Sequence, residues 1–300
     1  MKILLFGKEG QVGWELQRSL SLQGQLRAVD LQEVDLEDFD GIRHCVSQYQ
    51  PDIVVNAAAY TAVDKAESES AKAYRVNAEA VGVMAEEVRK LNAWLVHFST
   101  DYIFDGEKAS PYEEDDPVCP LSVYGKSKLK GEQLIRGSHA KHLIFRTSWV
   151  YAARGHNFAK TILRLAREKD ELKIIDDQYG APTSAELIAD VVAMVLSQIC
   201  RATDNGEFAG IYHLVASGET SWYGFAQYVL ELAQAMGVEL KTRAEEVQSI
   251  PTSAYPLPAR RPRNSRLNTS KLCKTFNINL PDWHFHVQRL VSELVIQEAL

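Results

Sequence analysis

Tyr124 and Lys128 are the side chains of this sequence best suited to moving a proton. They lie four residues apart in the run Y-G-K-S-K, near the expected start of a helix, where this spacing places both on one face. The pKa of a tyrosine is ordinarily near 10, and a neighbouring ammonium lowers it toward the working range. The phenol could then protonate a carbonyl oxygen while a hydride reaches the carbonyl carbon. The Y-x-x-x-K spacing is common, so this interpretation needs support from other positions.

Thr100 supplies that support, because it follows an apolar run at 94–99 that we expect to be a strand. In a parallel sheet flanked by helices, the carboxyl ends of the strands line the ligand crevice. A threonine hydroxyl there can hydrogen-bond a substrate carbonyl oxygen beside Tyr124. The three residues together predict the reduction of a carbonyl group.

A glycine-rich turn predicts where the hydride donor binds. Gly7, Gly10 and Gly13 follow the apolar run 2–6 with the spacing G-x-x-G-x-x-G and open a helix expected at 12–22. Glycines at such a turn allow close approach to a pyrophosphate, and the helix N-terminus supplies free N–H groups. With a strand before and a helix after it, this turn favours a dinucleotide over a purely structural role.

Asp30 ends the second expected strand, 25–30, where a carboxylate can accept hydrogen bonds from an adenosine ribose. Such a contact favours NAD by repelling the 2′-phosphate of NADP, although Lys8 and Arg27 could offset the repulsion. Asp30 could also be an ordinary turn residue, so the choice between NADH and NADPH stays open. Asp35 and Leu36 could flank the adenine, and the small residues at 57–59 could lie beneath the dinucleotide.

The elements that position these residues alternate regularly in the first half of the chain. Strands are expected at 2–6, 25–30, 52–56, 94–99 and 143–147, and helices at 12–22, 39–49, 71–91 and 123–135. This alternation predicts right-handed βαβ crossovers and an α/β fold with a doubly wound (Rossmann) parallel sheet. A smaller C-terminal α/β substrate-binding domain should follow.

The expected division of the chain is discontinuous. Residues 1–150 and about 171–215 should form the NAD(P)-binding domain, and 151–170 with about 216–300 the substrate-binding domain. In the second half, helices are expected at 158–167, 185–199, 222–236 and 283–296, and strands near 172–175 and 211–215. The segment 251–268 is rich in proline and arginine and should be an extended loop.

Composition excludes several classes of protein. The chain has 300 residues, 33 basic and 40 acidic residues, a net charge of −7 and 46% hydrophobic residues. We therefore expect no general binding to nucleic acid and no association with a membrane. The four cysteines show no C-x-x-C pair, and no apolar stretch approaches the length of a membrane span. A reduced, cytoplasmic protein fits best.

Longer runs resemble those of the dTDP-4-dehydrorhamnose reductases, which are extended short-chain dehydrogenases/reductases. The resemblance covers almost the whole chain, and several of its runs are specific to that family. It rests on G-K-E-G-Q-V-G-W-E-L (7–16), V-N-A-A-A-Y-T-A-V-D-K-A-E (55–67), S-T-D-Y-I-F-D-G (99–106), P-L-S-V-Y-G-K-S-K (120–128), F-R-T-S-W-V-Y (145–151), D-Q-Y-G-A-P-T (177–183) and R-P-R-N-S-R-L (261–267).

The resemblance implies hydride transfer from NADPH or NADH to the C4 ketone of dTDP-4-dehydro-β-L-rhamnose, the last step of dTDP-L-rhamnose synthesis. Tyr124 would donate the proton, Lys128 would lower its pKa and hold the nicotinamide ribose, and Thr100 would orient the ketone. Sugar contacts would come from Thr100, Asp101 and Trp149, although Trp149 could equally be a core residue. Cofactor contacts would come from Gly10, Gln11, Val12, Asp30, Ala59, Tyr60, Thr61, Tyr124 and Lys128.

The sequence leaves the roles of two groups of charged residues undecided. The arginines at 260, 261, 263 and 266 could bind the substrate diphosphate, because guanidinium groups bind phosphate bidentately, or could face solvent. Some relatives are described as homodimers bridged by Mg²⁺ through glutamates, and Glu15, Glu186 and Glu293 match those positions. They could equally be three surface glutamates.

Two other functions remain possible at this point. A reductase of another dTDP-4-keto-6-deoxy sugar would need the same residues, because the product epimer depends on which ring face meets the nicotinamide. The same motifs also occur in a non-catalytic regulatory subunit of methionine adenosyltransferase. Related dehydratases carry a second carboxylate after the aspartate, whereas Asp101 is followed by Tyr102, which favours simple reduction.

Overall fold

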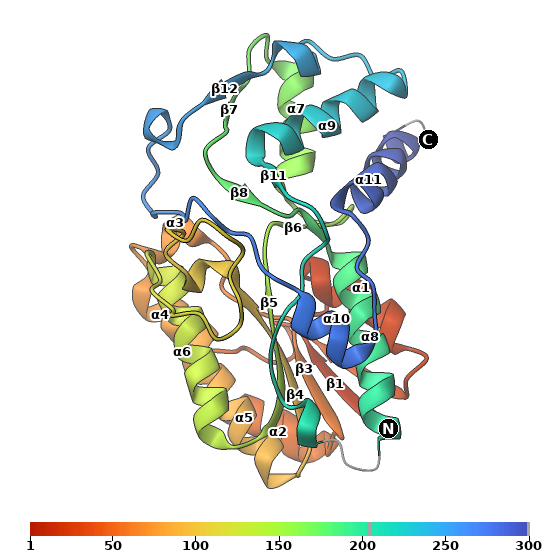
Figure 1. The fold of residues 1–300 in the computed structure, drawn as a ribbon. Helices are drawn as coiled ribbons and strands as arrows, with labels where there is room; N and C mark the ends of the chain where they lie inside the picture. The colour runs from red at the N-terminus through yellow and green to blue at the C-terminus, as the bar shows by residue number, and fades with distance from the viewer. Residues whose placement is uncertain (203–205, 299–300) are drawn as a thin grey trace.

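A parallel sheet forms the centre of the larger part of the molecule (Figure 1). The computed structural model describes residues 1–202 and 206–298. The sheet has six strands in the order β10-β5-β4-β3-β1-β2, and every neighbouring pair is parallel. The strands are β1 (Lys2–Phe6), β2 (Gln25–Val29), β3 (Ile53–Asn56), β4 (Trp94–Thr100), β5 (Lys141–Thr147) and β10 (Gly210–His213).

The chain order of this sheet fixes where a ligand can bind. From β1 the chain passes to β2 on one side and then to β3 on the other side of β1. The connections that leave the carboxyl ends of β1 and β3 therefore run in opposite directions and leave a crevice between them. The glycine turn after β1 and the small residues after β3 lie at this crevice.

Helices cover both faces of the sheet, because successive side chains of its central strands point to opposite faces and nearly all of them are buried. Ile3 and Leu5 pack into the core under α1 (Gln11–Leu20) and α8 (Ala185–Arg201). Leu4 and Phe6 pack on the opposite face under α2 (Phe39–Tyr49), α5 (Ala80–Lys90) and α6 (Val123–Ser138). The predicted doubly wound α/β class is confirmed.

A smaller group of elements lies beyond the carboxyl ends of the strands (Figure 1). It contains α7 (Phe158–Glu168), α9 (Trp222–Ala235) and α11 (Trp283–Glu298), with β7 (Lys173–Ile175) paired to β12 (Gln248–Ile250). Two short pairs join the two groups of elements: β6 (Val150–Tyr151) with β9 (Thr183–Ser184), and β8 (Tyr179–Gly180) with β11 (Thr220–Ser221). The strand expected near 172–175 is therefore β7, which lies outside the central sheet.

The long helix expected at 71–91 is interrupted. The structure has α4 (Ser70–Tyr74), the π-helix η1 (Arg75–Glu79) and then α5, with a short α3 (Val63–Ala66) before them. The second half of the chain also contains α10 (Ser270–Phe276), which the sequence patterns did not predict. The segment 251–268 is extended as expected, except for the 3₁₀ turn η5 (Thr252–Ala254).

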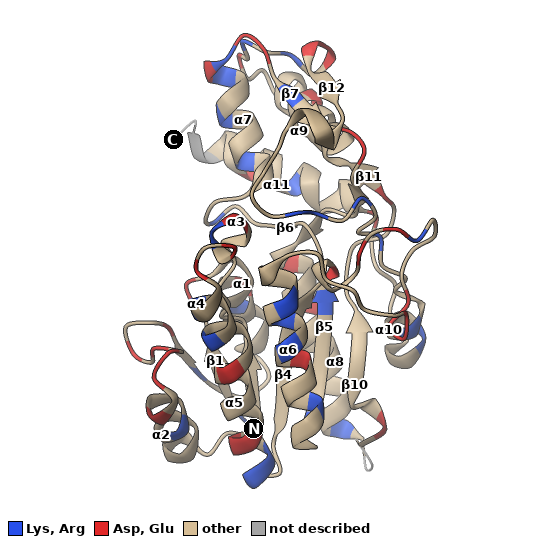
Figure 2. Ribbon diagram, turned by 90° about the vertical axis from the view of Figure 1, so that its left-hand side faces the viewer, with Lys and Arg blue, Asp and Glu red and all other residues tan. Residues whose placement is uncertain are grey.

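Charged residues of both signs are interspersed over the elements (Figure 2). Within residues 1–202 and 206–298, no helix is both long and apolar enough to cross a membrane.

Candidate active site

The turn between β1 and α1 requires glycine at two of its three glycine positions. Gly7 has a φ of +86°, and a Cβ atom there would lie 2.6 Å from the backbone nitrogen of Ala58. A Cβ atom on Gly13 would lie 1.8 Å from the carbonyl oxygen of Gly7, so the helix rests directly on the turn. At Gly10 the nearest atom to a Cβ would be 3.4 Å away. Gly10 therefore leaves space for a ligand beside the backbone.

The first turn of α1 is open to an anion. Gly10 caps the helix without a side-chain hydrogen bond among the described residues, so the N–H groups of Gln11 and Val12 face outward unpaired. The segment after β6 lies beside this turn, because Asn157 Nδ2 donates to Gln11 Oε1 at 3.0 Å. Arg154 pairs with Glu9 in the turn itself. Sequence reasoning missed Arg154 and Asn157, because only the tertiary fold brings them to the glycine turn.

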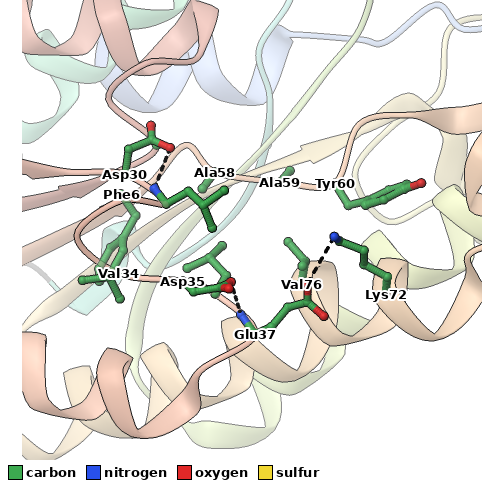
Figure 3. A pocket seen from close by; sticks show the side chains of 13 residues that line it. Phe6, Asp30, Val34, Asp35, Glu37, Ala58, Ala59, Tyr60, Lys72 and Val76 are labelled. Atoms are coloured by element: carbon green, nitrogen blue, oxygen red, sulfur yellow. Dashed lines mark hydrogen bonds and ion pairs between the residues drawn. The ribbon is translucent and has the colours of Figure 1, made fainter.

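A pocket of about 220 Å³ lies between the carboxyl ends of β1 and β2 and the loop after β3 (Figure 3). Asp30 stands at its edge, where its two carboxylate oxygens accept the backbone N–H groups of Glu9 and Leu31, each at 2.8 Å. Five further residues expected at the cofactor site line the pocket: Gly7, Asp35, Leu36, Ala59 and Tyr60. Thr61 is exposed just beyond it. Glu37, Lys72 and Val76 also line the pocket and were not predicted.

The two cations expected to offset the charge of Asp30 differ in their position. Lys8 pairs with Glu33, and the Asp30 carboxylate also helps to raise the pKa of Lys8. The Arg27 guanidinium lies 5.7 Å from the ring centroid of Tyr49, whose hydroxyl donates to the carbonyl of Gln25 at the start of β2. Arg27 thus points toward the amino end of its strand, away from Asp30.

The π-helix η1 brings Asn77 to the cofactor loop. Its Oδ1 accepts the backbone N–H of Tyr60 at 2.8 Å, and its Nδ2 donates to the Tyr60 carbonyl at 3.0 Å. The same Nδ2 lies 3.0 Å from the hydroxyl of Ser127 on α6. Asn77 therefore links the loop after β3 to the helix that carries Tyr124 and Lys128. Interruptions of this kind often mark functional sites.

Tyr124, Thr100 and Asp101 form one hydrogen-bonded group at the end of β4. The Thr100 hydroxyl donates to Asp101 Oδ1 at 3.0 Å. The same hydroxyl can turn to donate to the Tyr124 oxygen, an interaction that lowers the pKa of Tyr124. Tyr102 packs edge-to-face on the Tyr124 ring, with centroids 6.0 Å apart. The structure thus brings together Tyr124, Thr100 and Asp101 as the sequence predicts.

Burial dominates the acid–base behaviour of this group. It raises the pKa of Tyr124, and the Asp101 carboxylate raises it further, against the opposing effect of the Thr100 hydrogen bond. Burial also raises the pKa of Asp101 to about 7, although hydrogen bonds to Ser265 and Thr100 oppose it. Within the described residues, Asp101 Oδ2 is buried and has no hydrogen-bond partner. Tyr124 is therefore a protonated phenol in the chain alone, as a proton donor must be.

Lys128 lies deeper than its spacing from Tyr124 suggests. Its side chain is buried, and Nζ donates to the Phe98 carbonyl oxygen at 2.6 Å and lies 3.3 Å from His97 Nε2. Burial lowers the pKa of Lys128 to about 8, with the Glu132 carboxylate opposing. The expected lowering of the Tyr124 pKa by Lys128 is not seen in the chain alone, because the amine is directed toward Phe98 and His97.

Trp149 lies just beyond the end of β5, next to β4, in a strained conformation. Its φ of +49° is rare for a bulky residue and is typical of functional sites. The indole stacks on Trp222 with centroids 3.6 Å apart, and a Cβ atom on Gly180 would lie 2.7 Å from it. This packing fixes the half-buried ring at the junction between the sheet and the outer helices.

Beside this stack lies an apolar groove of about 340 Å³, lined mainly by residues of α7, β7 and the 251–268 loop, among them Trp222, Tyr255, Leu257 and Arg261. The structure distinguishes among the four arginines of the loop. Arg261 pairs with Asp64 at 2.7 Å, and Arg266 pairs with Glu219 at 3.1 Å. Arg260 and Arg263 are exposed and make no ion pair with any described residue.

Comparison with known proteins identifies the family. The family model described as RmlD substrate binding domain matches residues 1–296. The dTDP-4-dehydrorhamnose reductase of Escherichia coli strain K12 is 51% identical over 304 residues, which cover 100% of both chains. This chain belongs to the dTDP-4-dehydrorhamnose reductase family. The family named from the sequence motifs is thereby confirmed.

Solved structures of this reductase family agree with the fold. The dTDP-4-dehydrorhamnose reductase of Clostridium acetobutylicum has a TM-score of 0.87 at 34% identity, with 100% of both chains covered. That of Bacillus anthracis, solved in complex with NADP, has a TM-score of 0.86 at 29% identity and covers 97% of this chain and 99% of its own. The chain is therefore an oxidoreductase with the full architecture of its family.

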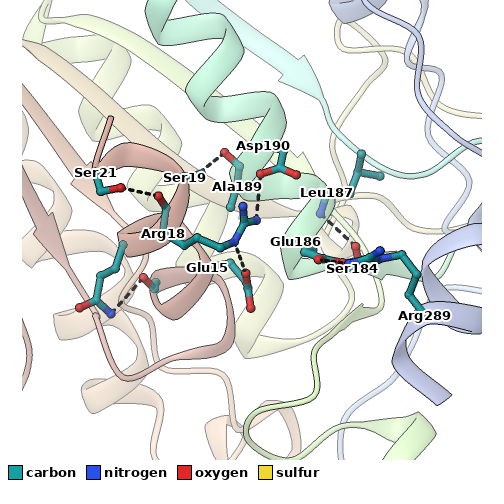
Figure 4. Close-up of polar contacts among 12 residues, drawn as sticks. Glu15, Arg18, Ser19, Ser21, Ser184, Glu186, Leu187, Ala189, Asp190 and Arg289 are labelled. Atoms are coloured by element: carbon teal, nitrogen blue, oxygen red, sulfur yellow. Dashed lines mark hydrogen bonds and ion pairs between the residues drawn. The ribbon is translucent and has the colours of Figure 1, made fainter. Parts of the chain in front are cut away.

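The glutamates that match a magnesium site in some reductases of this family do not form one within the chain (Figure 4). Glu15 pairs with Arg18 at 3.1 Å, and Glu186 pairs with Arg289 at 2.8 Å. Glu293 is exposed on α11. Among the described residues, no group of three His, Cys, Asp or Glu side chains is placed to hold a metal ion. With Glu15 and Glu186 paired to arginines, this donor set does not fit Mg²⁺ in a single chain.

Proposed function

We propose that the chain reduces the C4 ketone of dTDP-4-dehydro-β-L-rhamnose to dTDP-β-L-rhamnose with NADH or NADPH. The observation that carries the proposal is the Tyr124–Thr100–Asp101 group at the carboxyl end of β4, beside the crevice of the glycine turn. The presence of Tyr124, Lys128 and Thr100 together favours catalysis over the regulatory-subunit alternative.

The cofactor fits the residues of the crevice. Gly7, Gly10 and Gly13 with the α1 N-terminus suit a pyrophosphate, and the pocket beside Asp30 suits adenosine. Gln11, Val12, Tyr60 and Thr61 complete the proposed contacts. When bound, the dihydronicotinamide supplies the hydride. Lys128 is proposed to hold the nicotinamide ribose.

The proton comes from Tyr124. In the chain alone its hydroxyl lies beside the Thr100 hydroxyl, which can donate to the Tyr124 oxygen. A ketone oxygen that binds between them offers a new acceptor, so that the Tyr124 hydroxyl turns to it and passes its proton as C4 gains the hydride. Two residues are proposed to contact the sugar: Trp149, and Asp101 through Oδ2, which has no hydrogen-bond partner in the described part of the chain. One hydride and one proton convert the ketone to the alcohol, and the phenolate regains a proton from solvent.

The dTDP moiety is proposed to lie in the groove beside the Trp149–Trp222 stack. Arg260 and Arg263 are the arginines of the loop that remain available for the diphosphate, because Arg261 and Arg266 already pair with carboxylates. We therefore propose that the part around the central sheet binds the cofactor and that residues 151–170 with about 216–300 bind the substrate.

The setting of the reaction is also a proposal. The four cysteines are free thiols in the structure, which favours a reducing compartment such as the cytoplasm. A homodimer remains the proposed assembly. Bridging by Mg²⁺ would require Glu15 and Glu186 to leave Arg18 and Arg289, so the proposed dimer does not include a bridging metal ion.

The test is direct. The full chain is mixed with dTDP-4-dehydro-β-L-rhamnose and NADH or NADPH, loss of dihydronicotinamide absorbance is followed, and the sugar product is identified by NMR. We expect turnover with dTDP-β-L-rhamnose as product. A different C4 epimer would assign the chain to another dTDP-4-keto-6-deoxy sugar, and no turnover with dinucleotide binding intact would overturn the proposal.

A further inference from the structure

A line of buried hydrogen bonds runs from the loop after β3 to the amine of Lys128. The backbone N–H of Ala58 donates to Asn56 Oδ1 at 3.2 Å, and Asn56 Nδ2 lies 3.2 Å from His97 Nδ1. The other ring nitrogen of His97, Nε2, lies 3.3 Å from Lys128 Nζ. Asn56, His97 and Lys128 are 1%, 0% and 2% exposed, so water does not supply alternative partners.

The direction of each hydrogen bond follows from the first. A backbone N–H can only donate, so the atom of Asn56 that faces Ala58 is the amide oxygen. The amide nitrogen of Asn56 therefore faces His97 and can only donate to Nδ1. Nδ1 then carries no proton. A neutral imidazole must carry its single proton on Nε2, the nitrogen that faces Lys128.

The His97 ring is neutral in this place. Burial, and secondly the Lys128 charge, hold the pKa of His97 well below its usual value. Its Nε2–H group points at Lys128 Nζ, and an ammonium has no lone pair to accept it. An uncharged amine can accept from His97 and still donate to the Phe98 carbonyl oxygen 2.6 Å away.

We propose that Asn56 and His97 are positioning residues that favour the uncharged form of the Lys128 amine before the cofactor binds. This inference rests on the proposed function of Tyr124 as the acid. Loss of positive charge on this amine weakens its stabilisation of a phenolate one turn earlier on α6, so Tyr124 stays protonated until the reactants arrive.

The surrounding charges are compatible with an uncharged amine. Glu132, one turn after Lys128 on α6, forms a buried ion pair of 2.8 Å with Arg146 of β5. Asp101 and Tyr124 lie at the carboxyl end of β4, and burial raises the pKa of both. Burial lowers the pKa of Lys128 to about 8, which is the direction this geometry favours, and leaves a minor share of the amine uncharged at pH 7.

The first test reads the His97 ring directly in the full chain without cofactor. Long-range ¹H–¹⁵N NMR of ¹⁵N-histidine-labelled protein separates protonated from unprotonated ring nitrogens. The loss of one signal in His97→Gln assigns His97 among the eight histidines. We expect a neutral ring at neutral pH with the proton on Nε2. A ring protonated on Nδ1, or on both nitrogens, would overturn the proposal.

The second test reverses the direction of the hydrogen bonds. In Asn56→Asp the carboxylate accepts from both Ala58 N–H and His97 Nδ1–H, which leaves Nε2 as an acceptor for an ammonium. The Lys128 pKa, followed through its ¹³Cε resonance, should rise by roughly one to three units, as expected near an added carboxylate. Asn279→Asp, which adds the same charge at an exposed site, is the control and should leave the Lys128 pKa unchanged.

An unchanged Lys128 titration in a folded Asn56→Asp protein would contradict the inference. If that variant does not fold, the ring protonation of the wild-type chain decides alone. Neither measurement needs cofactor or substrate. A chain without reductase activity would therefore refute the proposed function and leave this inference standing.

Discussion

At the residue scale, Asp101 connects the geometry of the site to its response to pH. Its carboxyl is 3% exposed, accepts the Thr100 hydroxyl, and leaves Oδ2 without a partner among the described residues. With its pKa raised to about 7 by burial, Asp101 is largely protonated below that pH and ionised above it. The ionised form opposes the charge that develops on Tyr124 when the phenol gives up its proton.

Turnover should therefore fall as the pH rises through about 7. We expect this fall in the kcat–pH profile of the wild-type chain. It should be absent from Asp101→Asn, in which the group does not titrate, even if its overall turnover is lower. The same fall in the variant would show that another group causes it.

Asp30 should control the choice of cofactor. Its carboxylate is fixed at the pocket edge by two backbone N–H groups, and Lys8 and Arg27 have other partners. Asp30→Ala removes the repulsion of a 2′-phosphate and should raise kcat/KM for NADPH relative to NADH by roughly tenfold, about 1.4 kcal/mol. Asp40→Ala, an exposed carboxylate on α2, is the control. An unchanged ratio in Asp30→Ala would show that Asp30 does not face the ribose.

Single residues differ in how well the sequence predicts them. Tyr124, Thr100 and Asp101 follow strand ends or begin a helix, so local pattern places them correctly. The sequence does not show whether Trp149 is a core residue or a site residue, because its φ of +49° and its stack on Trp222 are properties of the fold. The depth of Lys128 and its contact with His97 likewise depend on how α6 packs on β4.

At the element scale, the packing of α1 on the glycine turn determines whether the phosphate site forms. Gly13→Ala places a Cβ atom 1.8 Å from the Gly7 carbonyl oxygen, so the helix must shift. We expect a loss of about 1–3 kcal/mol in the free energy of unfolding, measured in urea, together with weaker cofactor binding.

Gly137→Ala in α6 is the matched control, because a Cβ atom there would meet nothing within 4 Å. This change should be neutral or should stabilise the chain by up to about 1 kcal/mol, since alanine favours the helix. Equal stability and cofactor affinity in the two variants would contradict the close packing of α1 on Gly7.

The elements themselves were largely predictable. β1 and α2 have the predicted bounds, and most others differ by one to three residues. The continuous helix expected at 71–91 was wrong in one respect, since η1 interrupts it where Asn77 binds the backbone of Tyr60. The pairing of β7 with β12 was not predicted either, because it joins segments more than 70 residues apart.

At the scale of the whole molecule, the 251–268 loop connects the two groups of elements. Arg261 pairs with Asp64 on α3 through contacts of 3.1 and 2.7 Å and also hydrogen-bonds Tyr102, which packs on Tyr124. This contact fixes the part of the loop that carries Arg260 and Arg263 beside α3. The Arg261 guanidinium lowers the pKa of Asp64, so the stabilisation is present at neutral pH and is lost as the pH falls through that pKa.

Arg261→Met should therefore raise the KM for the dTDP-sugar roughly fivefold, equivalent to about 1 kcal/mol, with a smaller effect on kcat. Asp64→Asn should act similarly, and the double variant should show less than the sum of the two effects. Arg243→Met, which changes an exposed arginine between α9 and β12, is the control. Additive effects of the Arg261 and Asp64 changes would contradict their coupling.

The central claim is that Tyr124 donates the proton to the substrate ketone. The most direct measurement compares single-turnover reduction of dTDP-4-dehydro-β-L-rhamnose by wild-type and Tyr124→Phe protein, with cofactor affinity measured separately. The proposal predicts a loss of roughly two to four orders of magnitude in rate with cofactor affinity largely kept. A rate near that of the wild type in Tyr124→Phe would contradict the claim and require another proton donor.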